Sequence, residues 1–280
     1  MSAQRPFSTI AVMNAKGGVG KSTLTLALAE TLAVYHRKRI LLIDADGQMS
    51  LSLMLMPVER LNALRDSGKT LTDILAGTLP GGHPLPWKAC VAESVGDVEE
   101  AEGLFLIPGN MDLPLVERGL AKDGDMRHVR AVCRTMLQEA SQHVDMVIVD
   151  CAPGISVTTE CWLRECNWHL VPVRPDVLAI GGVQYVRHFR MRDPHLGFSR
   201  HLGVVVNMKQ LSSQTDETIH QLLMSNADMR CFRDAVPTIP HIQKAALYSR
   251  EGRSYVAKYP GTAGTAIRTI AAEVLSRIKK

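Results

Sequence analysis

The stretch Ala15-Lys-Gly-Gly-Val-Gly-Lys-Ser-Thr23 decides the fold of this 280-residue chain. It ends in Gly-Lys-Ser, as does the phosphate-binding loop G-x-x-x-x-G-K-[ST], although Ala15 stands where the first glycine belongs. The glycines allow backbone N–H groups to turn inward around phosphate oxygens. We expect Lys21 to reach the β- and γ-phosphates and the Ser22 hydroxyl to ligate Mg²⁺.

The residues around this loop follow the pattern that the loop requires. The run Thr-Ile-Ala-Val-Met at 9–13 predicts a buried strand before the loop. The apolar run 24–32 predicts a helix after it, with its N-terminus facing the bound anion. Lys16 is the unusual residue, because Lys21 already serves the nucleotide of its own loop.

Apolar runs typical of strands alternate with helical patterns along the chain. Such near-continuous apolar strands favour a parallel sheet, so the sequence predicts an α/β, doubly wound, mostly parallel sheet with helices on both faces. The expected strands are 9–13, 39–44, 104–108, 145–150, 169–173, 202–207 and 235–239. The expected helices are 24–35, 113–121, 127–142, 157–165, 181–191, 215–225 and 264–279.

No internal repeat or low-complexity linker divides the sequence, and we expect residues 1–280 to form a single domain built around the phosphate-binding loop. Residues 57–100 are the least regular part because they are interrupted by prolines and glycines. We expect them to form surface excursions. The acidic residues within 93–102 are expected to be solvated.

Composition and charge narrow the classes of function. The net charge of +4 permits nucleic-acid binding without requiring it. The 6 cysteines include no C-x-x-C pair, which argues against a zinc site or a redox motif, and Cys151 is expected to be buried. The N-terminus lacks an apolar signal core and no run of 18 apolar residues occurs, so we expect a soluble, cytoplasmic protein.

Two of the expected strands end in aspartate, at Asp44 and at Asp150. Ligands of doubly wound folds bind at the carboxyl ends of the strands. We expect Asp150 to hold Mg²⁺ through water, and Asp46 to position Mg²⁺ or the attacking water. Asp44 is a further candidate. The alternative for all three is that they cap turns or helices.

These motifs together resemble the ParA/MinD group of P-loop ATPases, which carry a deviant Walker A loop. The resemblance is greatest to the ParA/Soj-type partition and cargo-positioning ATPases, and it spans roughly residues 8–275. The matching stretches are 14–23, 42–48 (Leu-Ile-Asp-Ala-Asp-Gly-Gln) and 147–154 (Val-Ile-Val-Asp-Cys-Ala-Pro-Gly), with weaker matches at 106–110, 171–172, 204–207 and 238–240.

The resemblance implies a homodimer that sandwiches two ATP molecules, with ATP and Mg²⁺ as cofactors. Lys16 is then the signature lysine, which crosses to the phosphates of the partner's nucleotide. Asp46 is implied to be the switch carboxylate of a slow, partner-stimulated hydrolysis, and Asp150 the Walker B residue. The implied site residues are Lys16, Lys21 and Asp46 for catalysis; Gly17, Gly18, Val19, Gly20, Lys21, Ser22, Thr23, Asn207 and Pro240 for the nucleotide; and Ser22, Asp46 and Asp150 for the metal.

Several branches of the group are disfavoured by the sequence. It lacks the C-x-x-C of the iron–sulfur carriers, the second loop of the arsenite pumps and the tyrosine cluster of the kinases. A metabolic amidoligase of this fold stays open, although Lys16 argues against it. Gly47, Met49 and Ala15 also depart from the usual ParA pattern of proline, glycine and glutamine.

Two positioning branches remain. A MinD-like protein reaches the membrane through a C-terminal amphipathic helix, but we expect 265–280 to be a packed helix and membrane binding to be absent. A ParA-like protein binds nonspecific DNA when ATP-bound, is nucleoid-associated, and is released by a ParB-like or cargo-adaptor protein. Its cargo could be a plasmid or chromosome partition complex, a carboxysome or a chemoreceptor cluster.

Basic residues of the C-terminal half are the candidates for phosphate contacts with DNA, although scattered charges usually form a solvated face. The candidates are Arg187, Arg190, Lys209, Arg230, Arg233, Arg250 and Arg253, together with Arg192, Arg200, Lys244 and Lys258.

Overall fold

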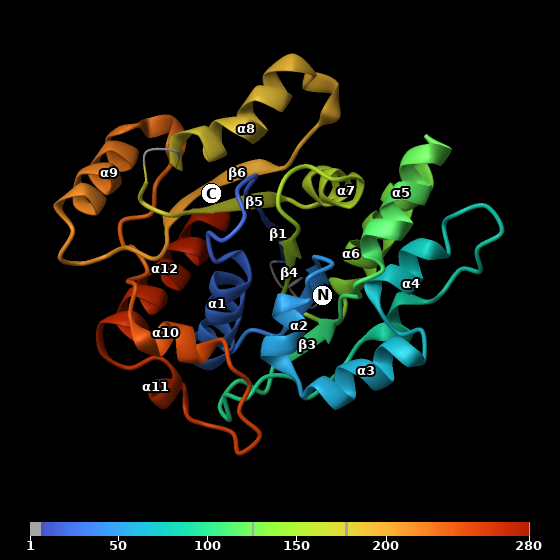
Figure 1. Cartoon of the computed structure of the whole chain (residues 1–280), viewed down its shortest axis with the longest axis horizontal. Coiled ribbons are helices and arrows are strands. Elements are labelled where there is room, and N and C mark those ends of the chain that lie inside the picture. Colours follow the sequence, from blue (N-terminus) through green and yellow to red (C-terminus); the bar gives the residue numbers. More distant parts are fainter. Residues whose placement is uncertain (1–6, 125, 177–178, 280) are drawn as a thin grey trace, which may run out of the picture.

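The computed structural model describes residues 7–124, 126–176 and 179–279. Within these residues, parallel strands form one 6-stranded sheet in the order β3-β2-β4-β1-β5-β6 (Figure 1). This confirms the expected α/β fold. The strands are β1 (Ser8–Val12), β2 (Ile40–Ala45), β3 (Leu104–Ile107), β4 (Met146–Cys151), β5 (Trp168–Val173) and β6 (Arg200–Val206).

Helices connect the strands and include all those expected from the sequence. Five short ones, α2, α3, α4, α10 and α11, were not predicted. The helices are α1 (Lys21–His36), α2 (Ser50–Leu55), α3 (Val58–Asp66), α4 (Leu71–Ala76), α5 (Leu113–Asp123), α6 (Arg127–Ala140), α7 (Val157–Glu165), α8 (Ala179–Arg192), α9 (Gln214–Ser225), α10 (Pro240–Ala245), α11 (Tyr255–Lys258) and α12 (Gly261–Ile278).

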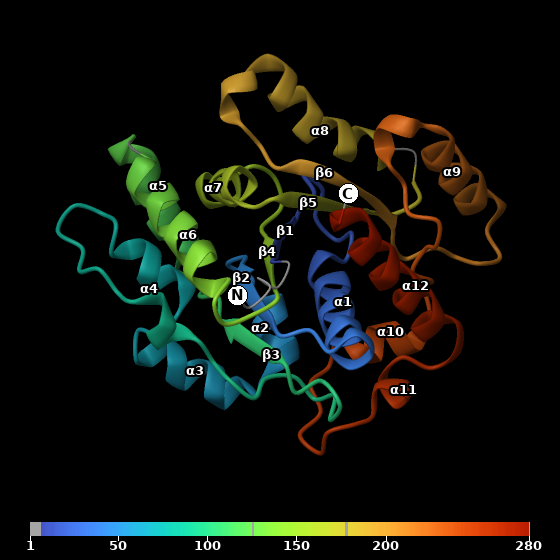
Figure 2. The same ribbon diagram turned by 180° about the vertical axis from the view of Figure 1, so that it is seen from behind.

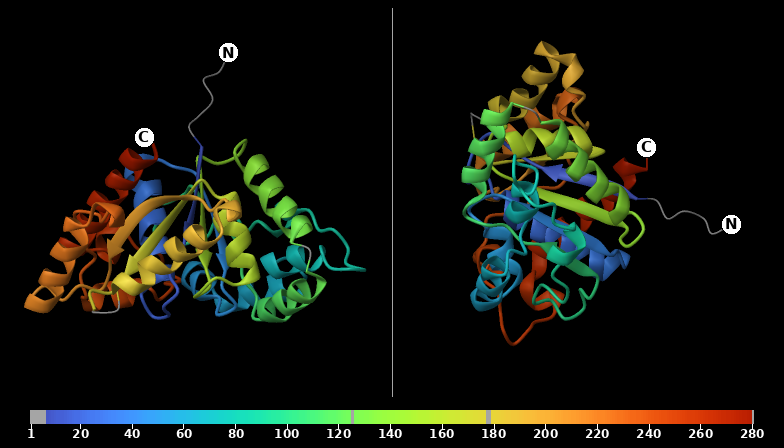
Figure 3. Two further views of the ribbon diagram at one scale, coloured as in Figure 1. Left: turned by 90° about the horizontal axis from the view of Figure 1, so that it is seen from above. Right: turned by 90° about the vertical axis from the view of Figure 1, so that its right-hand side faces the viewer.

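Both faces of the sheet are buried because successive side chains of each strand point to opposite sides. Ile10 and Val12 of β1 pack in a core with α1 and α12, while Ala11 of β1 and Met13, just after it, pack in a second core with α6 and α7. Figure 2 shows the same layers from behind. In Figure 3, α9 and α12 gather at the β6 end of the sheet, and α4 and α5 gather at the β3 end.

The expected strand at 235–239 is wrong. Val236 N–H does donate to Val206 O at 2.9 Å, so the segment runs beside β6. Pro237 follows, and it has no N–H with which to continue a ladder. The chain then bonds to Lys209 instead, through Thr238 N–H at 2.8 Å, and only an isolated bridge forms.

The irregular stretch 57–100 contains two short helices, α3 and α4, whose Leu61, Leu71 and Leu75 are buried. The expectation of a solvated acidic segment at 93–102 is wrong for Asp97. This side chain is 5% exposed and bonds to Lys258, because the segment packs against residues 249–258.

The C-terminal helix α12 packs against α1, as expected. Its apolar positions Ile267, Ile270, Ala271 and Val274 are all 0% exposed. Among the helices that the structure describes, none is both long and apolar enough to cross a membrane.

Candidate functional site

The phosphate loop joins the carboxyl end of β1 to the first residue of α1. Gly18 and Gly20 adopt positive φ angles of 71° and 77°, which other residues rarely adopt. A Cβ at Gly20 would also lie 2.4 Å from Asn207 Nδ2, so glycine is required there for space as well. No acidic residue stands in the first turn of α1, and its free N–H groups are available to an anion.

Asn14, which follows β1, and Asn207, which follows β6, hold this loop in place. The Asn207 side-chain amide donates to Val19 O at 2.8 Å, which ties the end of β6 to the loop. The Asn14 amide donates to Pro172 O at 2.7 Å, and its Oδ1 accepts Lys16 N–H at 2.9 Å. Asn14 was not predicted as a site residue, although an amide at the end of a buried strand was a usable signal.

Lys21, Ser22 and Thr23 form the first turn of α1 beneath the loop, and the Lys21 side chain is buried at 7% exposure. Pro240, which was implied to lie near adenine, is the first residue of α10. Its role and the adenine contact of Asn207 stay predictions.

Three aspartates meet beside the loop, as the strand-end argument predicted. Asp44 and Asp150 are paired residues on the adjacent strands β2 and β4, and Asp46 follows on the loop after β2. All three are buried, at 0%, 0% and 8% exposure. Asp46 Oδ1 accepts Gln48 N–H at 3.0 Å, which fixes the loop around it.

Asp150 has the environment of a cation-binding group. Neither of its carboxylate oxygens has a hydrogen-bond partner within the described residues. Burial raises the pKa of Asp150 well above its usual range, and the neighbouring charge of Asp44 raises it further. The Ser22 hydroxyl, which lies near Asp150 but outside normal hydrogen-bond geometry, and the charge of Lys21 oppose this shift without reversing it. A divalent cation beside Ser22 and Asp150 would remove this electrostatic penalty, so the residues fit Mg²⁺.

Asp44 is bound by protein groups instead. Its Oδ2 accepts Ser52 N–H at 2.8 Å and the Ser52 hydroxyl at 2.6 Å. Ser52 Oγ in turn accepts Gly109 N–H at 3.0 Å, so this network joins β2, α2 and the loop after β3. Burial still raises the pKa of Asp44 to about 6. Ser52 was not predicted as a site residue, because it belongs to the unpredicted helix α2.

Lys16 lies at the rim of the site, where its side chain is 41% exposed. Its ammonium does not rest on its own loop. It forms an ion pair with Asp176, with 2.6 Å between Nζ and Oδ2. Asp176, which was not predicted as a site residue, follows the end of β5, the neighbour of β1.

The basic candidates fall into different environments. Three candidates are bound to carboxylates of the fold and do not form part of an exposed basic face: Lys209 Nζ bonds to Glu217 at 2.7 Å, while Arg253 and Lys258 both bond to the buried carboxylate of Asp97. Buried carboxylates hold two of these cations because they require a charge partner. The side chain of Arg190 lies outside the described residues. Arg187, Arg230, Arg233 and Arg250 are exposed.

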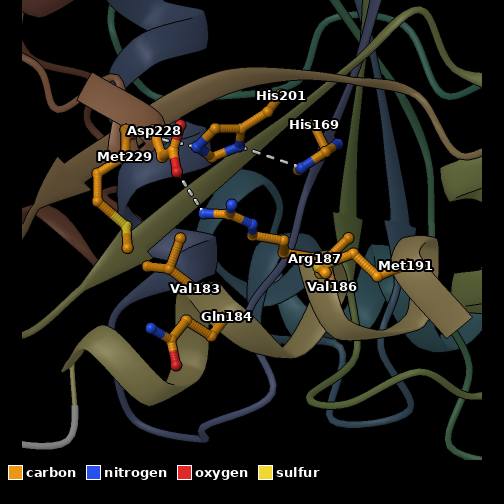
Figure 4. A pocket seen from close by; sticks show the side chains of 9 residues that line it. All are labelled: His169, Val183, Gln184, Val186, Arg187, Met191, His201, Asp228 and Met229. Carbon is orange, nitrogen blue, oxygen red and sulfur yellow. Dashed lines mark hydrogen bonds and ion pairs between the residues drawn. The ribbon is translucent and has the colours of Figure 1, made fainter. Parts of the chain in front are cut away.

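A separate cavity of about 390 Å³ lies between β5, β6, α8 and the turn Ala227–Met229 (Figure 4). His169 and His201 contact each other there, with 3.1 Å between Nε2 and Nδ1, and Arg187 pairs with Asp228. Both histidines are the second residues of their strands. The cavity therefore lies away from the carboxyl ends of the strands and is not part of the phosphate site.

Known proteins of similar sequence and fold indicate the family of this chain. The model of a family described as "AAA domain" matches residues 7–192. The chromosome partitioning protein ParA of Caulobacter vibrioides is 28% identical over 284 residues, covering 99% of this chain and 97% of that protein.

Two solved structures share the fold. A variant of McdA from Cyanothece in complex with ATP has a TM-score of 0.75 at 18% identity, covering 98% of both chains. Cobyrinic acid a,c-diamide synthase from Mycobacterium smegmatis, with an ATP analogue and magnesium, has a TM-score of 0.74 at 20% identity, covering 98% of this chain and 96% of that one. The family match, the partitioning relative and the deviant loop with its aspartates lead to one assignment: the chain belongs to the ParA/MinD family of P-loop ATPases.

Proposed function

We propose that this ATPase is a spatial switch that dimerises with ATP, binds nonspecific DNA as a dimer, and positions a cargo. The observation that carries the proposal is the placement of Lys16. It is the additional lysine of the loop, it is half-exposed at the rim, and its ammonium is paired with Asp176 after β5. A lysine in this position is suited to a nucleotide on a second copy of the chain.

Hydrolysis in this proposal uses groups that the structure brings together. Lys21 and the partner copy's crossing lysine neutralise phosphate charge, Ser22 and Asp150 hold Mg²⁺, and Asp46 orients the attacking water. Turnover is slow until a ParB-like or cargo-adaptor protein stimulates it. On this basis Asp46→Ala should retain the ATP dimer and lose hydrolysis; unchanged turnover would refute the role of Asp46.

The DNA-binding face that we propose surrounds the turn Ala227–Met229. The ion pair between Arg187 and Asp228 places α8 beside this turn, and Arg230 and Arg233 follow directly after it. Arg250 belongs to a different region, between α10 and α11, where it pairs with Glu59. In Figure 1, α8 and α11 lie at opposite ends of the molecule.

The alternative of a MinD-type membrane ATPase is disfavoured by helix α12. Its apolar residues are part of the core with α1, so inserting them into a membrane would expose that core to water. The fold alone does not exclude a synthase, since one such enzyme shares it. The partitioning relative favours a positioning ATPase, and with it one domain in a cytoplasmic, nucleoid-associated protein.

Binding to a nonspecific DNA duplex tests the proposal, with ATP, ADP or no nucleotide and at low and moderate salt. We expect binding only with ATP, and a steep loss as salt rises, because phosphate contacts release counterions. Arg230→Ala with Arg233→Ala should weaken binding, whereas Arg250→Ala is the matched control. An ATP dimer that binds no DNA in any condition would refute the DNA step and redirect the search to liposomes and protein partners.

A further inference from the structure

The ion pair between Lys16 and Asp176 joins two loops of the same protomer. Lys16 follows β1 and Asp176 follows β5, and these strands are hydrogen-bonded neighbours. The Lys16 backbone is fixed by Asn14, while its ammonium lies 2.6 Å from Asp176 Oδ2. Both side chains are about 40% exposed, at 41% and 38%. The pair is therefore at the surface and can open without disturbing the core.

We propose that Asp176 is a positioning residue that retains Lys16 on its own protomer and thereby sets the threshold for ATP-driven dimerisation. This inference rests on the proposed function, in which Lys16 crosses to the partner's phosphates. We infer that the Lys16 ammonium leaves Asp176 when it reaches a phosphate on the other subunit. Each protomer must therefore break this ion pair before the dimer can close.

The size of the effect follows from the exposure of the pair. Exposed ion pairs are weak, and two of them break for every dimer formed. Removing both should tighten the dimer by about 2- to 30-fold. The ion pair stabilises the dissociated protomer and not the dimer. Its loss should therefore change the dimer dissociation constant by the same factor with ATP and with ADP. Asp176 thus sets how much protein is needed for dimerisation, while the nucleotide sets which state dimerises.

The test measures the dimer dissociation constant by analytical ultracentrifugation, with a non-hydrolysable ATP analogue or ADP. Asp176→Asn keeps the shape of the side chain and removes its charge, and we expect it to lower the constant by the factor above. Asp176→Glu keeps the charge and should stay closer to wild type. Glu59→Gln is the matched control, because it removes the partner of a different exposed cation, Arg250.

Two further measurements separate this role from a structural one. The difference between wild type and Asp176→Asn should shrink as salt rises, since salt screens an exposed pair. It should also vanish when Lys16 is already replaced, so Asp176→Asn should change nothing in a Lys16→Ala background.

The outcomes separate this inference from the function on which it rests. A wild-type protein that forms no ATP dimer overturns the proposed function and this inference with it. If the wild type forms an ATP dimer and Asp176→Asn does not tighten it, only the role of Asp176 is overturned. A weaker dimer would show that Asp176 orients Lys16 toward the partner, and an unchanged dimer would show that Asp176 plays no part.

Discussion

Two regions of this molecule bury carboxylates completely, and they treat them in opposite ways. On one side of α1, Glu30 Oε1 accepts a hydrogen bond from Lys258 Nζ at 2.7 Å, and Glu30 Oε2 accepts one from the Tyr259 hydroxyl at 2.7 Å. At the phosphate loop, Asp150 is equally buried, and both of its oxygens lack a partner within the described residues. A buried charge without a partner is expensive and is retained where a ligand will supply the partner.

The paired region is an ionic cluster of Glu30, Asp97, Lys258 and Arg253. Lys258 Nζ bridges the two carboxylates, at 2.7 Å from Glu30 and 2.6 Å from Asp97. Arg253 bonds to the other oxygen of Asp97 at 2.8 Å. The cluster joins helix α1 to the acidic segment and to α11. Its two positive and two negative charges balance, so it needs no external ion.

The largest expected effect comes from breaking the paired cluster. Lys258→Met leaves Glu30 without its cation in the core, and we expect a loss of about 3–5 kcal/mol of unfolding free energy. Urea unfolding measures it. Arg250→Met, which breaks the exposed pair with Glu59, is the control and should change little. A Lys258→Met protein as stable as wild type would show that the cluster does not stabilise the fold.

The same variant gives a pH prediction. Burial already raises the pKa of Glu30, and Lys258 opposes that rise. Without Lys258 the pKa of Glu30 in the folded state should rise further above its unfolded value. The folded state then binds more protons, so stability falls as pH rises through this window. The destabilisation by Lys258→Met should therefore be smaller at pH 5 than at pH 8, and an equal loss at both would contradict it.

Asp44 is intermediate between the two regions, because it is hydrogen-bonded to Ser52 but is not paired with a cation in the described residues. The variant Ser52→Ala tests how much these hydrogen bonds contribute. The change removes a hydrogen bond to a buried carboxylate and leaves Gly109 N–H without its acceptor. We expect a loss of about 1.5–3 kcal/mol in urea unfolding, together with slower hydrolysis. Ser67→Ala is a suitable control, since its hydroxyl bonds only to α3 backbone at an exposed site. Equal effects of both variants would refute the role of the network.

The smallest and most diagnostic change is Asp150→Asn. Removing an unpartnered buried charge should stabilise the nucleotide-free protein by about 1 kcal/mol, measured by thermal unfolding. The same variant should lose the further stabilisation that Mg²⁺ with ATP gives to wild type. If Asp150→Asn instead destabilises the nucleotide-free protein, Asp150 has a structural partner and is not reserved for the metal.

The phosphate loop and the aspartates beside it were predictable from the sequence, because these residues are adjacent in the chain or stand at the ends of strands. Gly18 and Gly20 indicate a backbone with positive φ angles. Asp150 lies near the end of an apolar run that indicates a buried strand. The short helices were missed because four to nine residues carry too little periodic signal. The 235–239 strand was overpredicted because Pro237 cannot donate to a strand ladder.

The sequence by itself determined the parallel α/β fold, the phosphate loop and the aspartates, because local backbone chemistry and strand periodicity specify them. Only the tertiary structure decided which charges are paired. Asp176 meets Lys16 across 160 residues, and Lys258 meets Glu30 across 228. Partners so far apart in the chain are chosen by the order of strands and the packing of helices. For this reason the paired cluster, the unpartnered Asp150 and the restrained Lys16 could be found only in the folded molecule.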